Sequence, residues 1–179
     1  MINGEEGMID VWEALGVNHR LHLNTVDGVL WASNSYWAVA VDDKGKMAGV
    51  LREFGVPLAP GVFMVGRSIQ PISGEPGDLA MLVADRPELH PISSRKVNDQ
   101  PVYIRDDSAL ELRWHVLIDL PEGNVGAFDS RFVDLCQDLA PGEWYGTADP
   151  FAAIYRIHEG RPTAMLKGVR HPVTGLVKA

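Results

Sequence analysis

Histidines are the residues of this chain that could bind a metal or transfer a proton near neutral pH. Six are present, and only His19 and His22 lie close together, three positions apart. A zinc site needs three or four protein ligands, and no third ligand follows near this pair. We therefore expect structural or surface histidines. A metal-dependent hydrolase, built by the convergence of distant histidines and aspartates, is kept as an alternative.

Paired carboxylates occur at Asp42-Asp43 and at Asp106-Asp107. Both pairs lie in turn-like stretches, where an aspartate side chain accepts hydrogen bonds from the nearby backbone, so they predict turns rather than acid–base catalysis. The chain has no Gly-x-Ser-x-Gly elbow, no P-loop and no glycine-rich dinucleotide fingerprint. The sequence thus predicts a protein that is not an enzyme, with no catalytic residue, no cofactor and no metal.

Composition is that of an ordinary globular protein. The chain has 179 residues, of which 46% are hydrophobic and 22% charged, enough for one domain or two small ones that share a core. The one cysteine, Cys136, excludes an internal disulfide and falls on the apolar side of a helical pattern, which predicts a small buried hydrophobe. No long apolar run and no secretory leader is present, so we expect a cytoplasmic protein without membrane contact.

The formal net charge is -8, which is unusual for a protein that binds nucleic acid. Such proteins present a basic face, and the acidic balance therefore lowers the expectation of direct DNA binding.

Hydrophobic periodicity predicts the elements of the first half. A short amphipathic helix is expected at 7–15, then a hairpin of strands 21–25 and 29–33 with Asp27-Gly28 in its turn, then a strand at 36–41. The following part is rich in proline, which favours edge strands and loops. Within it we expect strands at 62–65 and 79–83 and a loop at 73–78. Three further strands are expected, and they are 102–105, 109–114 and 115–118.

The second half offers the clearest helix, which runs from about Ser130 to Leu139 and ends at Pro141-Gly142. Turn signals then separate three predicted strands, 144–147, 152–157 and 163–167.

A motif lies at the start of this helix, in the helix-like stretch 128–135. The sequence Phe128-Asp129-Ser130-Arg131-Phe132, followed by strand-like runs that end in Met165-Leu166-Lys167-Gly168-Val169-Arg170, resembles the closing module of DNA sliding clamps. Those proteins have an aromatic-Asn/Asp-x-Arg-aromatic helix start and close on an apolar strand ending in Met-Pro-x-Arg. The resemblance covers 125–170 and, more loosely, 18–42; Lys167 and Gly168 replace the family's Met and Pro.

The resemblance implies an α+β fold that is DNA-clamp-like, with two helix-plus-antiparallel-sheet units packed as one clamp domain. The first unit would span about 1–100, including the proline-rich irregular segment 51–100. The second unit would span about 101–170, and a tail would follow at 171–179.

Sliding clamps enclose DNA in a ring lined by helices whose lysines and arginines face the phosphates. The helices predicted here carry an acidic face instead, with Asp10 and Glu13 on the first and Asp134 and Asp138 on the second. An oligomeric clamp around duplex DNA is therefore the alternative rather than the first expectation. The acidic face predicts a solvated surface or docking to a basic groove of a nucleic-acid-binding protein.

Candidate contacts for a protein partner come from two places. Trp31, Tyr36 and Trp37 surround a predicted turn and would form an exposed aromatic anchor, unless two of the three alternate into the core. Lys167, Val169 and Arg170 stand where bacterial clamps border a pocket for partner peptides. We expect a non-enzymatic clamp-fold protein that acts through protein–protein contacts. The resemblance suggests a phage-type accessory or inhibitor of nucleic-acid machinery, able to form a homo-oligomer.

Overall fold

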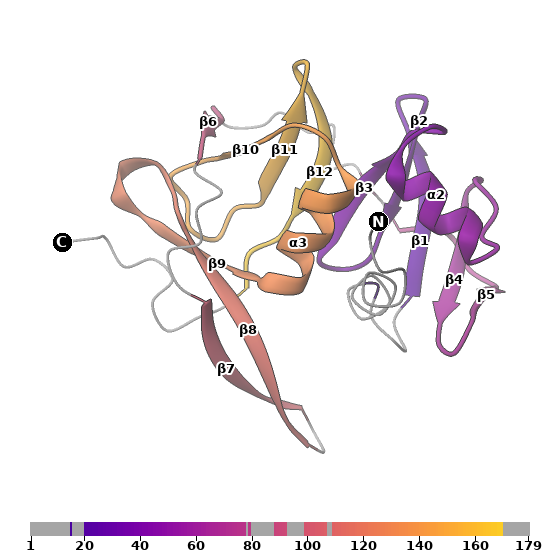
Figure 1. Cartoon of the computed structure of the whole chain (residues 1–179), viewed down its shortest axis with the longest axis horizontal. Helices are drawn as coiled ribbons and strands as arrows, with labels where there is room; N and C mark the ends of the chain where they lie inside the picture. The colour runs from indigo at the N-terminus through magenta and orange to yellow at the C-terminus, as the bar shows by residue number, and fades with distance from the viewer. Residues whose placement is uncertain are drawn as a thin grey trace, which may run out of the picture.

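The computed structural model describes residues 15, 20–77, 79, 88–92, 99–106 and 109–169, and side chains at 99–115 are not considered. Figure 1 shows the chain as a mixed structure in which helices cover a large antiparallel sheet. The predicted first helix is represented only by Leu15, which is helical and fully buried, and its remaining residues lie outside the described part.

Five strands from the first half of the chain form one side of the large sheet, in the order β5-β4-β1-β2-β3. They are β1 (Arg20–Val26), β2 (Val29–Ser33), β3 (Trp37–Val41), β4 (Gly61–Val65) and β5 (Ile69–Ile72). Asp27 and Gly28 join β1 to β2 with φ angles of 48° and 79°. Both central residues of a type I′ turn need positive φ, which explains the Asp-Gly pair and confirms the predicted hairpin.

Four strands from later in the chain complete this sheet, in the order β12-β11-β10-β6. They are β6 (His90–Pro91), β10 (Glu143–Gly146), β11 (Ile154–His158) and β12 (Arg161–Leu166). The two sides join where β12 pairs antiparallel with β3, with Leu166 opposite Trp37 and Ala164 opposite Val39. The nine strands therefore form one continuous sheet in which the first and last described strands lie near the middle.

A second sheet of three antiparallel strands has the order β7-β8-β9. Its strands are β7 (Asp99–Asp106), β8 (Ala109–Asp119) and β9 (Val125–Asp129), and a short 3-10 turn, η2 (Pro121–Gly123), joins the last two. Figure 1 shows β7 and β8 extending away from the large sheet. Val116, Ile118 and Phe128 on one face of this sheet belong to the main core, so the base of the sheet is part of the same packed body.

Two helices, α2 (Lys46–Glu53) and α3 (Ser130–Leu139), lie on the same face of the large sheet (Figure 1). They bury apolar side chains at helical spacing: Met47, Ala48 and Leu51 from α2, and Phe132, Val133, Leu135, Cys136 and Leu139 from α3. These residues pack with Leu21, Leu23, Trp37 and Val39 of the sheet in one core. We call this the helix-covered face.

The start of α3 explains the residues of the clamp-like motif. Asp129 is 2% exposed and caps the helix, because its Oδ1 accepts a hydrogen bond from the Arg131 backbone N–H at 3.0 Å. The Arg131 guanidinium then pairs with the same carboxylate, at 2.8 Å from Nη2 to Oδ2. Phe128 is fully buried, and the Phe132 ring stacks on Tyr36 at 5.5 Å between centroids. The N-cap hydrogen bond and the ion pair satisfy the buried Asp129 carboxylate, and they hold the start of α3 against the sheet.

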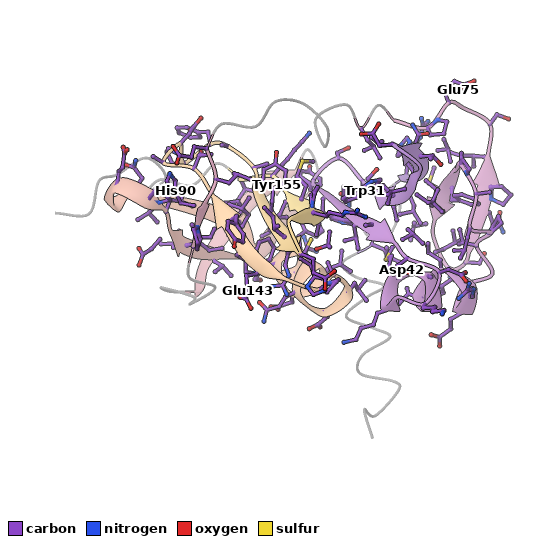
Figure 2. The ribbon with its side chains drawn as sticks, turned by 90° about the horizontal axis from the view of Figure 1, so that it is seen from above. Trp31, Asp42, Glu75, His90, Glu143 and Tyr155 are labelled. Carbon is purple, nitrogen blue, oxygen red and sulfur yellow. The ribbon has the colours of Figure 1, made fainter. Side chains whose placement is uncertain are left out.

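The opposite face of the large sheet carries a smaller cluster. Trp31, Ala38, Tyr155 and Met165 lie on it, and Leu79 and Leu89 pack against them. Leu79 and Leu89 belong to the connection between β5 and β6, which are the two edges of the sheet. Figure 2 shows Glu75 and His90, near the two ends of the connection, far apart in the molecule. We call this the helix-free face, because neither α2 nor α3, the helices of the described residues, packs on it.

The structure confirms the predicted helix 130–139 with both boundaries, and most predicted strands within two residues. It corrects others. Helix α2 is not predicted by the sequence analysis. The expected strands 109–114 and 115–118 are one strand, β8, and Phe128 and Asp129 end β9 rather than begin the helix. Leu79 lies outside any strand, and residues 80–83 of the strand expected there are not described.

Candidate functional site

A cleft of about 180 Å³ opens on the helix-free face, and we call it the His22–Lys167 cleft. Four parts of the chain meet there: β1, the turn between β2 and β3, the β5–β6 connection, and the end of β12. The described lining residues are His22, Ser33, Asn34, Ser35, Trp37, Ala38, Gly77, Leu79, Met165 and Lys167. The cleft is therefore built at the joint between the two sides of the sheet.

Strand β1 holds the β5–β6 connection over the sheet through two polar side chains. The Gly77 backbone N–H donates to His22 Nδ1 at 2.9 Å, and Asn24 Nδ2 donates to the Gly77 carbonyl at 3.1 Å. His22 and Asn24 are two residues apart in a strand, so their side chains point to the same face. Alternation along β1 thus directs Leu21 and Leu23 into the core and the polar pair toward Gly77.

The hydrogen bond to His22 fixes the state of its ring. Because Nδ1 accepts a hydrogen bond from the Gly77 N–H, a neutral His22 carries its own hydrogen on Nε2, which makes that nitrogen a donor. Burial lowers the pKa of His22, and the nearby positive charge of Arg20 lowers it further. The neutral donor form is therefore favoured in the folded protein.

Asn34 forms the turn at one wall of the cleft. Its Oδ1 accepts hydrogen bonds from the backbone N–H groups of Tyr36 at 2.8 Å and Trp37 at 3.0 Å. This arrangement fixes the orientation of the amide, so Nδ2 points away from the turn. Nδ2 is buried, and within the described residues no acceptor pairs with it. An unsatisfied buried donor costs about 1–3 kcal/mol, and because Nδ2 itself is buried it is not open to a ligand in the cleft.

Lys167 stands at the rim, directly after β12. Its backbone N–H donates to the Tyr36 carbonyl at 2.9 Å, which anchors the residue, while its side chain is exposed. The sequence analysis named Lys167 as a candidate contact residue, and it lines the cleft. Its role in binding a partner stays a prediction.

The aromatic anchor expected around the 33–35 turn is wrong as a three-residue exposed cluster. Trp31 is 4% exposed and packs on the helix-free face, whereas Trp37 is 1% exposed and packs in the main core. The structure has the alternative arrangement, in which side chains alternate into the core, because Trp31 and Trp37 point to opposite faces of the sheet. Only Tyr36 reaches the surface, at 37% exposure, and its ring stacks on Phe132.

The other predicted contact residues lie apart from the cleft. Val169 packs against Leu117, Val125 and Ala127, and its N–H donates to the Ala127 carbonyl at 2.8 Å. Val169 is therefore half-buried beside β9 and adds one backbone hydrogen bond to that strand of the small sheet. Asp134 and Asp138 are exposed on α3, as the acidic-face prediction requires. The other three predicted residues, Asp10, Glu13 and Arg170, lie outside the described residues.

Metal and acid–base chemistry find little support in the described part of the chain. No group of three or more histidine, cysteine, aspartate or glutamate side chains there could hold a metal ion. Asp42 accepts hydrogen bonds from the backbone of Lys44 and Gly45, which confirms its predicted turn role. His22 and Ser33 face each other across β1 and β2, but Nδ1 of His22 is occupied by Gly77. With its hydrogen on Nε2, the ring has no free base to activate a serine.

Comparison with known proteins gives no relative. No family model, no curated protein and no solved structure matches the chain. Among the described helices, none is long and apolar enough to cross a membrane.

The sequence analysis missed most of the cleft. For His22 the sequence predicts a structural or surface histidine, with metal binding as the alternative, and it indicates no binding role for Asn34 or Gly77. Alternation in β1 already places His22 and Asn24 on the face opposite Leu21 and Leu23. No local signal, however, brings Gly77 or Lys167 next to them, because these contacts join distant parts of the chain.

Proposed function

We propose that this chain is a non-enzymatic, clamp-like protein that works by receiving a segment of a protein partner in the His22–Lys167 cleft. The observation that carries the proposal is the cleft itself, which combines apolar walls with the polar ring of His22 and a cation at Lys167. On the clamp resemblance, the partner is a component of nucleic-acid machinery, and the chain acts as its accessory or inhibitor.

The size of the cleft supports contact with a partner rather than a cofactor or large substrate. Ligand pockets for small molecules are usually about 300–1,000 Å³. At about 180 Å³ the cleft is smaller, and comparable to cavities that hold a single benzene ring. This volume suits one inserted side chain or chain end, with the rest of the partner lying on the surface outside.

The charges of the described helices oppose the alternative of a DNA-encircling oligomer. Together, α2 and α3 carry three basic residues, Lys46, Arg52 and Arg131, against three acidic ones, Glu53, Asp134 and Asp138. Two of these cations are already paired, Arg52 with Asp43 and Arg131 with Asp129. A ring wall needs surplus positive charge directed at phosphates, and these helices have none.

Site-specific photocrosslinking tests the proposal. A photoreactive amino acid replaces Ser35, which is exposed at the mouth of the cleft, and in a matched control it replaces Glu53, which is exposed on α2. In an extract of cells that produce the protein, we expect one discrete protein adduct from position 35 and none from position 53. A second change, Lys167→Glu, should remove that adduct. Equal adducts from both positions, or no effect of Lys167→Glu, would contradict the proposal.

Light scattering behind a sizing column separates the proposal from the clamp alternative. The protein is run alone and with a short DNA duplex at low and at physiological salt. We expect a monomer or dimer that ignores DNA. A closed ring of about six chains with salt-sensitive DNA retention would instead favour the oligomeric clamp.

A further inference from the structure

We infer that the His22–Lys167 cleft recognises the free C-terminal carboxylate of a peptide whose last residue has a small aliphatic side chain. This inference rests on the proposed function and names the chemistry of the segment that the cleft receives. It follows from the donors at the cleft, from its apolar walls and from its position in the sheet.

The polar groups at the cleft are suited to an anion. His22 lines the cleft, and its donor nitrogen is Nε2, because Nδ1 accepts the hydrogen bond from the Gly77 N–H. Lys167 adds a positive charge at the rim, and the described lining residues include no carboxylate. A carboxylate has two oxygens with several acceptor sites and no hydrogen to donate at neutral pH, so it matches this set of donors.

The local charge reinforces this choice in a protein whose formal net charge is -8. Arg20 precedes His22 by two residues on the same face of β1, and its charge acts on the His22 ring. Among the described residues, Arg20 and Lys167 therefore place two positive charges near the cleft. A carboxylate gains from both cations there, whereas a lysine or arginine side chain is repelled.

The walls and the volume describe the rest of the ligand. Ala38, Leu79 and Met165 supply apolar surface, and about 180 Å³ accommodates one small side chain with its carboxylate. Two side chains, or an aromatic side chain together with its terminal carboxylate, exceed this space.

The position of the cleft favours a chain end over a strand. Ser33, Ala38 and Met165 belong to β2, β3 and β12, and β2, β3 and β12 are all internal strands of the sheet. Their backbone groups are already paired, so a partner cannot add itself as a further strand there. A partner must instead insert from above the face, and a C-terminus inserts one residue without requiring the chain to continue past the β5–β6 connection.

Titration of the full chain with N-acetylglycylvaline, followed by ¹⁵N NMR, tests the inference. We expect saturable shifts of the Gly77 amide and the Asn34 side-chain NH₂, with a Kd on the order of millimolar for so small a ligand. The same dipeptide with a C-terminal amide should bind about tenfold more weakly or not at all, because it loses the charge-assisted hydrogen bonds. Equal affinity for acid and amide, or no saturable shift at either site, would overturn the inference.

Matched variants locate the effect. Lys167→Gln should weaken binding of the free acid by about tenfold, and raised salt should weaken it in the unaltered protein. Lys44→Gln, at an exposed lysine in the turn before α2, should change neither. Unchanged amide dispersion in both spectra shows that the variants fold. Binding that survives Lys167→Gln intact would contradict the assignment. The crosslinking experiment is independent, because an adduct at position 35 with no preference for the free acid would leave the proposed function standing.

Discussion

The two faces of the nine-stranded sheet are built on different principles. The helix-covered face is closed by α2 and α3 over aliphatic and aromatic side chains that leave almost no surface exposed. Among the described residues, Leu79 and Leu89 of the β5–β6 connection pack on the helix-free face, which mixes a small apolar cluster with His22, Asn24 and Asn34. Burial of apolar area therefore stabilises the first face, whereas a few directed hydrogen bonds organise the second.

This difference separates stability from recognition within one sheet. Neighbouring residues of a strand serve opposite roles, as Leu23 and Asn24 do in β1, because alternate side chains point to opposite faces. The face with few apolar contacts is also the one with an accessible cleft, and locally weak packing is typical of binding regions.

Thiol reactivity gives the largest expected contrast between the faces. Burial on the helix-covered face raises the pKa of the Cys136 thiol to about 12. At pH 8 this leaves roughly a thousandfold less thiolate than an ordinary thiol has, and the buried sulfur is also inaccessible. A chromogenic disulfide reagent should therefore react with native Cys136 at least about a thousandfold more slowly than with the urea-unfolded chain.

The variant Ser35→Cys supplies the control, because it places a second thiol at the exposed mouth of the cleft. One fast and one very slow phase are expected. Two fast phases in the native variant would mean that the helix-covered face opens readily.

Truncation of adjacent residues in β1 measures the energetic contrast. Leu23→Ala should lower the free energy of unfolding by about 2–5 kcal/mol, because it removes a fully buried side chain and leaves a cavity. Asn24→Ala should cost only about 0.5–1.5 kcal/mol, the value of its hydrogen bond to Gly77. Urea unfolding of both variants checks the values. Similar losses at the two positions would remove the distinction between the faces.

Protonation of His22 on the helix-free face should produce the smallest effect. Burial and Arg20 lower the pKa of His22, so the unfolded chain binds its proton more readily than the folded chain does. The contribution of this site to stability is then complete above about pH 6.5 and declines as the pH falls below that value. The free energy of unfolding of the unaltered protein and of His22→Gln, measured at pH 7.5 and 5.5, isolates the contribution of His22. The unaltered protein should lose more stability on acidification than the variant, and identical losses would contradict this role.

Local sequence signals predict the elements that depend on local physics. Asp27-Gly28 predicts the hairpin because few other residue pairs adopt two positive φ angles, and the spacing from Phe132 to Leu139 predicts α3. Helix α2 is not predicted because it is only eight residues long and contains Gly49. Its N-cap residue, Gly45, also makes no side-chain hydrogen bond to the helix. Strand β9 escapes because all five of its residues are buried, so it shows no alternation.

The cleft depends on long-range contacts, and this explains why the sequence yields only fragments of it. The family resemblance indicates Lys167, and the composition of residues 33–35 predicts the turn there. The pairing of β12 with β3 and the hydrogen bonds from Gly77 to β1 bring these fragments together. Neither pairing leaves a signature in the residues themselves, because such contacts join segments that are far apart along the chain.

The joint between β3 and β12 also has a consequence for the order of events during synthesis. Strand β3 leaves the ribosome early, but its partner β12 emerges only after almost the whole described chain. Until then β3 has a free edge, with Trp37 and Val39 lacking neighbours on that side, and such edges invite pairing with other chains. Nascent chains that stall before Leu166 should therefore aggregate or require a chaperone, because the two sides of the sheet can join only after β12 has left the ribosome.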